Sequence, residues 1–111
     1  MKGFGIGMAD ISFYKSPKWT SKRGRILRRD SYECQNCKRY FKTKTATTVH
    51  HIYFYEGYPE LALLSWNLIS LCNDCHNKMH NRVTDKPTKL GTEWQFKRKK
   101  EFENLYPPLK K

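Results

Sequence analysis

The chain has 111 residues, which suits one domain with a modest hydrophobic core. Its 22 Lys and Arg against 10 Asp and Glu give a formal net charge of +12, which favours a polyanionic partner, with solubility alone as the simpler explanation. Apolar runs fall short of the roughly 18 residues that a membrane span needs, and we recognise neither a signal peptide nor a basic amphipathic helix, so we expect a cytoplasmic protein without a membrane partner.

The first part of the chain predicts a loose arm followed by a basic helix. Residues 1–15 contain three glycines without clear periodicity, and we interpret them as a flexible N-terminal arm. Ser16 and Pro17 are typical of the N-cap and first position of a helix, which should run to about Arg29. The apolar residues spaced to share one face of this helix are Trp19, Ile26 and Leu27.

Two strands and a helix are expected next. Residues 47–53 and 66–71 are rich in β-branched and aromatic types, which favours strands. A helix should follow from about Asn73, a plausible N-cap, to about Arg82. With the basic helix, this order predicts an α+β core over residues 16–83.

Residues 84–111 are predicted to form a linker and a C-terminal basic helix. Pro87 and Gly91 mark the linker, and the Thr92 to Gln95 stretch matches a capping box that opens a helix to about Tyr106. The side chains of this helix expected to pack inward are Trp94, Phe102 and Leu105.

Four cysteines form two pairs with metal-ligand spacing. Cys34 and Cys37 make one CxxC turn, and Cys72 and Cys75 make the other. Two such turns supply four thiolates around one tetrahedral zinc ion, which leaves no position for water and so makes the zinc structural. Free buried thiols would not explain the paired spacing, and a redox CxxC needs a βαβ setting that is absent.

The four histidines of the chain lie within or just after the segment between the cysteine pairs. His76 and His80 are four residues apart on the expected helix, so both rings should project from one face and can share a cation. His50 and His51 are adjacent on an expected strand and should point to opposite sides, which allows them different tasks. Each histidine taken singly is more simply a structural residue.

Taken together, these motifs resemble the HNH endonuclease family. The resemblance covers roughly residues 19–82 and rests on the ordered combination of Val49-His50-His51-Ile52, Trp66-Asn67-Leu68, and Cys75-His76-Asn77-Lys78-Met79-His80. It implies a ββα-metal core, in which two strands and a helix hold one catalytic metal, together with the structural zinc knuckle and flanking helices.

The resemblance also implies a role for each matched residue. His50 and His76 would be ligands of the catalytic metal, and His80 a third ligand. His51 would be the general base that takes a proton from the attacking water, and Asn67 would hold the loop between the strands and so aim His51. The product ends implied for DNA hydrolysis are 5′-phosphate and 3′-hydroxyl.

The sequence departs from the family pattern beside the core motif. Tyr53 to Tyr55 stand where many members have a proline, and Ser31 stands where many have glycine, which puts substrate contacts in doubt. No acidic residue precedes His51, so the expected metal ligands are neutral. Such a site favours manganese, nickel or zinc over magnesium, and the identity of the catalytic ion stays open.

Basic residues are expected to bind DNA through its phosphates, with an ordinary solvated helix face as the alternative. The candidates are Lys18, Lys22, Arg23, Arg25, Arg28, Arg29, Lys97 and Arg98. Two other functions stay open: a non-catalytic zinc-dependent DNA-binding module, and a partner of a phage terminase in DNA packaging, which would be compatible with cleavage.

Overall fold

The computed structural model describes residues 8–81, 83–84 and 86–108. The elements in chain order are α1 (Met8–Lys15), α2 (Pro17–Arg29), α3 (Gln35–Arg39), β1 (Thr48–His51), the 3₁₀ turns η1 (Pro59–Leu61) and η2 (Ser65–Asn67), β2 (Leu68–Leu71), α4 (Asn73–Asn77), β3 (His80–Asn81), β4 (Lys86–Pro87), α5 (Lys89–Lys97) and α6 (Lys99–Leu105). Within these residues, no helix is long and apolar enough to cross a membrane.

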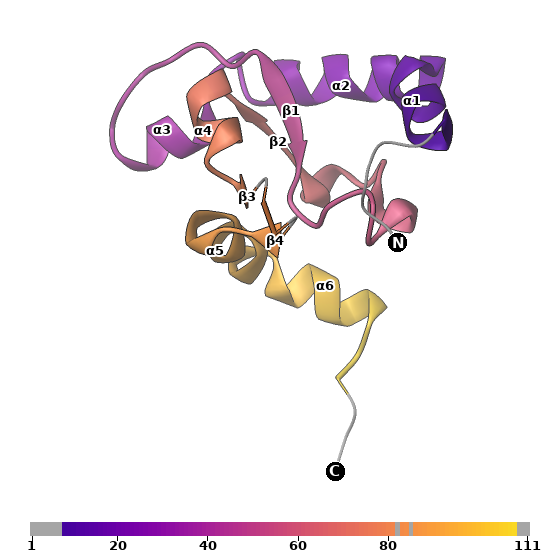
Figure 1. Ribbon diagram of the computed structural model, residues 1–111. Helices are drawn as coiled ribbons and strands as arrows, with labels where there is room; N and C mark the ends of the chain where they lie inside the picture. Colours follow the sequence, from indigo (N-terminus) through magenta and orange to yellow (C-terminus); the bar gives the residue numbers. More distant parts are fainter. Residues whose placement is uncertain (1–7, 82, 85, 109–111) are drawn as a thin grey trace.

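The centre of the fold is the antiparallel β1–β2 hairpin followed by α4, so the expected α+β class and ββα order are confirmed. Both strands are shorter than predicted: β1 ends at His51, and the 3₁₀ turn η2 takes the residues just before β2. Figure 1 shows α2 on one side of the hairpin and α5 and α6 on the other. The sheet therefore has two covered faces, and successive residues of β1 face different surroundings.

The α2 face of the sheet holds the first hydrophobic cluster. The prediction for α2 is confirmed: Pro17 is its first residue, and the Ser16 hydroxyl accepts a hydrogen bond from the Trp19 backbone N–H at 3.2 Å. The buried residues of this cluster are Trp19, Ile26, Leu27, Ala46, Val49 and Leu68. Burying each large apolar side chain here contributes on the order of 2 kcal/mol before chain entropy is subtracted.

The opposite face of the sheet holds the second cluster, which joins the sheet to α4, α5 and the cysteine turns. Its buried residues are Cys34, Ile52, Ile69, Leu71, Cys72, Cys75, Met79 and Trp94. The cysteine site is thus continuous with the core, and a metal ion bound there would also stabilise the fold.

The prediction of a loose arm over residues 1–15 is wrong for its second half. Residues 8–15 form α1, while residues 1–7 lie outside the described residues. The Phe13 ring stacks on Tyr55 with ring centroids 4.7 Å apart and contacts Trp19 at 5.4 Å. These tertiary contacts, which local glycine content could not reveal, stabilise a helix with little amphipathic pattern of its own.

The helix predicted from Asn73 to about Arg82 is also shorter than expected. It ends at Asn77, its N-cap is Cys72 rather than Asn73, and Arg82 lies outside the described residues. Met79 is fully buried, and its carbonyl accepts a hydrogen bond from Thr88 N. The chain therefore turns into the short β3–β4 hairpin, so His80 lies on a strand instead of on the helix.

The last helix begins earlier than predicted and is divided in two. Thr88, not Thr92, is the N-cap, and its hydroxyl accepts from Gly91 N at 3.1 Å. Gly91 is therefore helical, and it lies so close to β3 that a Cβ there would be 2.5 Å from the Met79 carbonyl oxygen. Arg98 separates α5 from α6.

Two of the three side chains expected to pack inward from this region do so. Trp94 is buried, and Phe102 stacks on Tyr53 with ring centroids 4.3 Å apart. Leu105 is exposed, so its predicted packing is wrong. Leu105 is the last residue of α6, one turn beyond Phe102.

Candidate active site

The four cysteines come together as predicted. Their sulfur atoms all lie within 4.8 Å of one another, and none of the four forms a disulfide. Cys37 Sγ is 4.0 Å from Cys72 Sγ and 3.7 Å from Cys75 Sγ. A tetrahedron of sulfurs about 2.3 Å from a central zinc has edges of about 3.8 Å, so the donor set fits one tetrahedral metal ion.

The thiols differ in how readily they ionise. Burial, followed by hydrogen bonds with Cys34 and Cys75, raises the pKa of the Cys37 thiol to about 12. Burial opposes ionisation of Cys72 as well, but the backbone N–H of Cys75 and the neighbouring thiols lower the pKa of Cys72 to about 7. Cys72 therefore ionises more readily than Cys37, and a bound cation would favour the thiolate form of both.

Asn36 supports the cysteine site, and the sequence analysis did not single it out. Its buried side chain donates from Nδ2 to Cys75 Sγ at 3.4 Å and accepts at Oδ1 from Trp94 Nε1 at 3.0 Å. The second bond joins residues 58 apart in sequence, so no local pattern could have indicated it. Through Asn36, the first cysteine turn is connected to the second turn and to α5.

His50 lies on the α4 face of β1. Its ring centroid is 5.2 Å from that of His76, the histidine of α4, as the family pattern implied. Burial, followed by the charges of His76, His51 and His80, lowers the pKa of His50 well below its ordinary value. Among the described residues, His50 Nε2 is the buried side-chain nitrogen or oxygen that has no hydrogen-bond partner. A neutral imidazole with an unpaired buried nitrogen fits a metal ligand.

His80 lies on β3 near His50, since its charge is among those that lower the pKa of His50. The Phe54 ring lies against both histidines, with its centroid 4.7 Å from the His80 ring and 5.9 Å from the His50 ring. In the described part of the chain, only the cysteine group has three or more metal-binding side chains with ligand atoms within 4.8 Å. His50 and His76 are thus in ring contact, and Phe54 packs against His80 and His50.

His51 points to the other face of β1, as the alternation predicted. Its Nε2 lies 3.0 Å from the Ala62 carbonyl oxygen, and its ring stacks on Trp19 with centroids 5.0 Å apart. Burial lowers the pKa of His51 to about 4, although the bond to Ala62 opposes this shift. Because a carbonyl oxygen only accepts, Nε2 carries the proton of the neutral ring, and the basic lone pair is on Nδ1.

Asn67 is fully buried and fixes the loop that holds His51. Its Oδ1 accepts from the Tyr53 backbone N–H at 2.7 Å, and its Nδ2 donates to the carbonyls of Tyr53 and Leu61, both at 3.2 Å. Leu61 precedes Ala62, the residue whose carbonyl contacts His51. The contacts of Asn67 thus match the loop-holding role that the sequence pattern implied for it.

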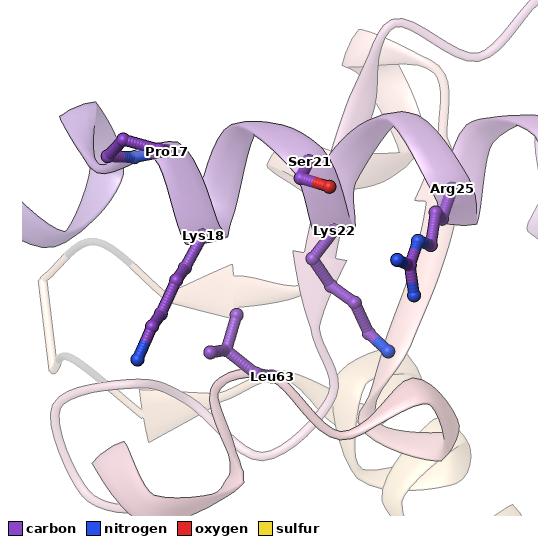
Figure 2. Close-up of a pocket in the computed structure, with 6 residues that line it drawn as sticks. All are labelled: Pro17, Lys18, Ser21, Lys22, Arg25 and Leu63. Carbon is purple, nitrogen blue, oxygen red and sulfur yellow. The ribbon is translucent and has the colours of Figure 1, made fainter.

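Basic side chains of α2 gather beside this loop. Figure 2 shows Lys18, Lys22 and Arg25 projecting from α2 toward the segment that carries Leu63. They line an open hollow of about 440 Å³, and Lys22 Nζ donates to Ser65 Oγ at 2.7 Å. Leu63 follows Ala62 in the chain, so the hollow and His51 lie on the same side of the hairpin.

The other basic candidates are placed differently. The Arg29 guanidinium binds Asp30, the Ser65 carbonyl and the Leu68 carbonyl at 2.7–3.0 Å, which gives it a structural task inside the molecule. Arg98 Nε donates to the Trp66 carbonyl at 3.0 Å, and Lys97 lies over the Trp94 ring. Arg28 is exposed, while Arg23 is exposed and donates to the Thr47 carbonyl at 3.0 Å.

Comparisons with known proteins agree with this arrangement. The family model described as HNH endonuclease matches residues 34–82, which contain both cysteine pairs and all four histidines. The crystal structure of the HNH endonuclease of the deep-sea thermophilic bacteriophage GVE2 with a manganese ion is similar at 36% sequence identity and a TM-score of 0.61. The match covers 62% of this chain and 75% of that one. Comparison with curated protein sequences finds no match.

The two findings and the site geometry support one another. The matched region carries the ββα hairpin and helix, the four-cysteine cluster, and the His50, His51, Asn67 and His76 arrangement. The chain therefore belongs to the HNH endonuclease family and is a nuclease.

Proposed function

We propose that this nuclease hydrolyses DNA phosphodiester bonds to 5′-phosphate and 3′-hydroxyl ends, with one divalent metal ion at His50 and His76 and with His51 as general base. The observation that carries the proposal is the division of labour between adjacent histidines. His50 has an unpaired buried nitrogen beside His76, while His51 is tied at Nε2 and keeps its basic nitrogen for another partner.

In the proposed step, His51 acts on water. A water molecule gives one proton to His51 Nδ1, and its oxygen forms a new bond to phosphorus. The bond from phosphorus to the 3′ oxygen breaks, and that oxygen leaves with the electron pair and takes a proton from solvent. The Ala62 carbonyl stabilises the imidazolium that forms, since it accepts a hydrogen bond from Nε2.

The proposed catalytic metal is held by neutral ligands. When bound, a divalent cation supplies Lewis-acid stabilisation of the phosphate and of the departing 3′ oxygen. His50 and His76 would supply nitrogen ligands, and His80, which packs against the same Phe54 ring as His50, is the candidate third ligand. Nitrogen ligands favour manganese, nickel or zinc over magnesium, and the similar phage GVE2 endonuclease was crystallised with manganese.

For the cysteine site, we propose structural zinc. Four thiolates at tetrahedral spacing, mostly buried and linked to the core, match the closed coordination of zinc sites that stabilise small domains. The metal would contribute directly to folding, because the two cysteine turns are separated by 34 residues that form the strands of the hairpin.

For DNA binding, we propose the hollow along α2 as the phosphate contact. Its Lys18, Lys22 and Arg25 lie on the His51 side of the hairpin, and the net charge of +12 favours a polyanion. Arg29 has its guanidinium engaged within the molecule and is not required for this contact. A link to a phage terminase and a cytoplasmic location stay predictions.

The deciding experiment is cleavage of a supercoiled plasmid by the zinc-loaded protein with magnesium, manganese or nickel added in turn. We expect metal-dependent nicking or linearisation by the wild type and at least about a hundredfold slower cleavage by His51→Ala. DNA binding and the unfolding midpoint should be unchanged in this variant. A folded, DNA-binding wild type that never cuts would instead favour a non-catalytic DNA-binding module.

A further inference from the structure

The aromatic surroundings of His51 include a hydroxyl that the family pattern does not assign. Four rings surround the imidazole: Trp19 of α2, Phe13 and Tyr14 of α1, and Tyr55 of the loop after β1, with centroids 5.0–6.1 Å from the His51 ring. Tyr14 also makes a polar contact, because its hydroxyl lies 3.5 Å from His51 Nδ1. It therefore faces the nitrogen that carries the basic lone pair.

The distance between these two atoms suits a shared water better than a direct bond. A good hydrogen bond from a hydroxyl spans about 2.7–2.8 Å, so 3.5 Å is a weak contact that a small displacement would open. Tyr14 is 41% exposed as a residue while His51 is buried, so the aromatic shell around His51 borders solvent at Tyr14. A water molecule that enters there meets His51 Nδ1 and the Tyr14 hydroxyl together.

The position of Tyr14 is fixed by the junction of the first two helices. Ser16 Oγ donates to the Phe13 carbonyl at 2.7 Å and accepts from Trp19 N at 3.2 Å, so one hydroxyl connects the end of α1 to the start of α2. Tyr14 lies between these anchored residues, and its ring meets the Trp19 ring edge-on at 5.6 Å. The Tyr14 ring is thus placed by this junction and by its contact with Trp19.

We propose that Tyr14 is a positioning residue for the general base: its hydroxyl holds the attacking water against His51 Nδ1. The proposal rests on the proposed role of His51. A phenolic O–H can accept a hydrogen bond from the water or donate one to it, and so restricts the orientations that the water adopts while its proton passes to Nδ1. The α1 helix would then be part of the active site.

The test is Tyr14→Phe, which keeps the ring and removes the hydroxyl. The measurement is the single-turnover rate of plasmid cleavage with enzyme in excess, which reports chemistry rather than product release. Loss of one positioning hydrogen bond should slow cleavage about threefold to tenfold. The dissociation constant for DNA, the metal concentration for half-maximal rate and the unfolding midpoint should stay at their wild-type values. A purely structural role would move the midpoint.

The matched control is Tyr40→Phe, the same change at a half-exposed tyrosine beside α3, with an expected rate equal to the wild type. A wild-type rate for Tyr14→Phe, while His51→Ala is inactive, would overturn this proposal and leave the proposed function intact. A faster rate would overturn it as well, since the hydroxyl would then obstruct the base. If His51→Ala cut as fast as the wild type, the proposed function itself would fail.

Discussion

Replacing Asn36 by alanine separates the cysteine site from the last helices without touching a cysteine. The change leaves the Trp94 indole N–H buried without an acceptor, which costs about 1–3 kcal/mol, and removes the bond to Cys75 Sγ, worth about 1 kcal/mol. We therefore expect the free energy of unfolding of the zinc-loaded protein to fall by about 2–4 kcal/mol. Zinc should also be lost about tenfold faster or more, because the bond to Cys75 holds one sulfur ligand in place.

Urea unfolding followed by tryptophan fluorescence measures the first effect, and transfer of zinc to a colorimetric chelator measures the second. The control is Lys38→Ala in the same turn, whose exposed ion pair with Glu33 spans 3.6 Å and is worth well under 1 kcal/mol. If Asn36→Ala matched Lys38→Ala in both measurements, the hydrogen bonds of Asn36 would contribute neither to stability nor to zinc retention. The proposed support of the cysteine site by α5 would then be refuted.

Two further predictions compare residues of one type in different surroundings. Gly91→Ala should lower the free energy of unfolding by roughly 2 kcal/mol or more, because the new Cβ would lie 2.5 Å from the Met79 carbonyl oxygen. In contrast, the Cβ of Gly24→Ala in α2 meets only the flexible end of a side chain at 3.3 Å, so this change should stabilise the protein by up to about 1 kcal/mol. Thermal unfolding measures both effects, and equal effects would contradict the close approach of α5 to the Met79 carbonyl. Arg25→Ala should weaken DNA binding and reduce the slope of its salt dependence by about one released ion, without changing stability. Arg29→Ala should lower the free energy of unfolding by about 1–2 kcal/mol and leave that slope unchanged. The opposite pattern in a salt titration of DNA binding would exchange the roles of the two arginines.

The parts of the site that the sequence predicted correctly depend on local spacing. Cysteines two residues apart within a turn, and adjacent histidines on a strand, lead to the same geometry whatever surrounds them. Ser16 and Pro17 likewise predicted the start of α2, because capping is a contact between near neighbours in sequence.

The parts that the sequence missed depend on contacts between distant segments. The spacing of His76 and His80 is helical, but burial of Met79 and the close approach of Gly91 turn the chain into a hairpin before a second helical turn can form. Asn36 and Tyr14 gain their importance from partners 58 and 37 residues away. Composition also could not distinguish Arg29, which binds backbone carbonyls, from the basic residues of α2 that face the hollow.

The pairing of β1 with β2 decides which of the two adjacent histidines faces α4 and which faces α2. Side chains alternate along a strand, so a shift of the chain by one residue would turn His50 toward α2 and His51 toward α4. Asn67 opposes that shift just beyond the end of β1. Its side-chain amide binds both the backbone N–H and the carbonyl of Tyr53, and its backbone carbonyl accepts from Ile52 N at 2.8 Å. Its fully buried amide thus holds the register as well as the loop. Asn67 then fixes His50, which faces α4, as well as His51, the proposed general base, since one register places both.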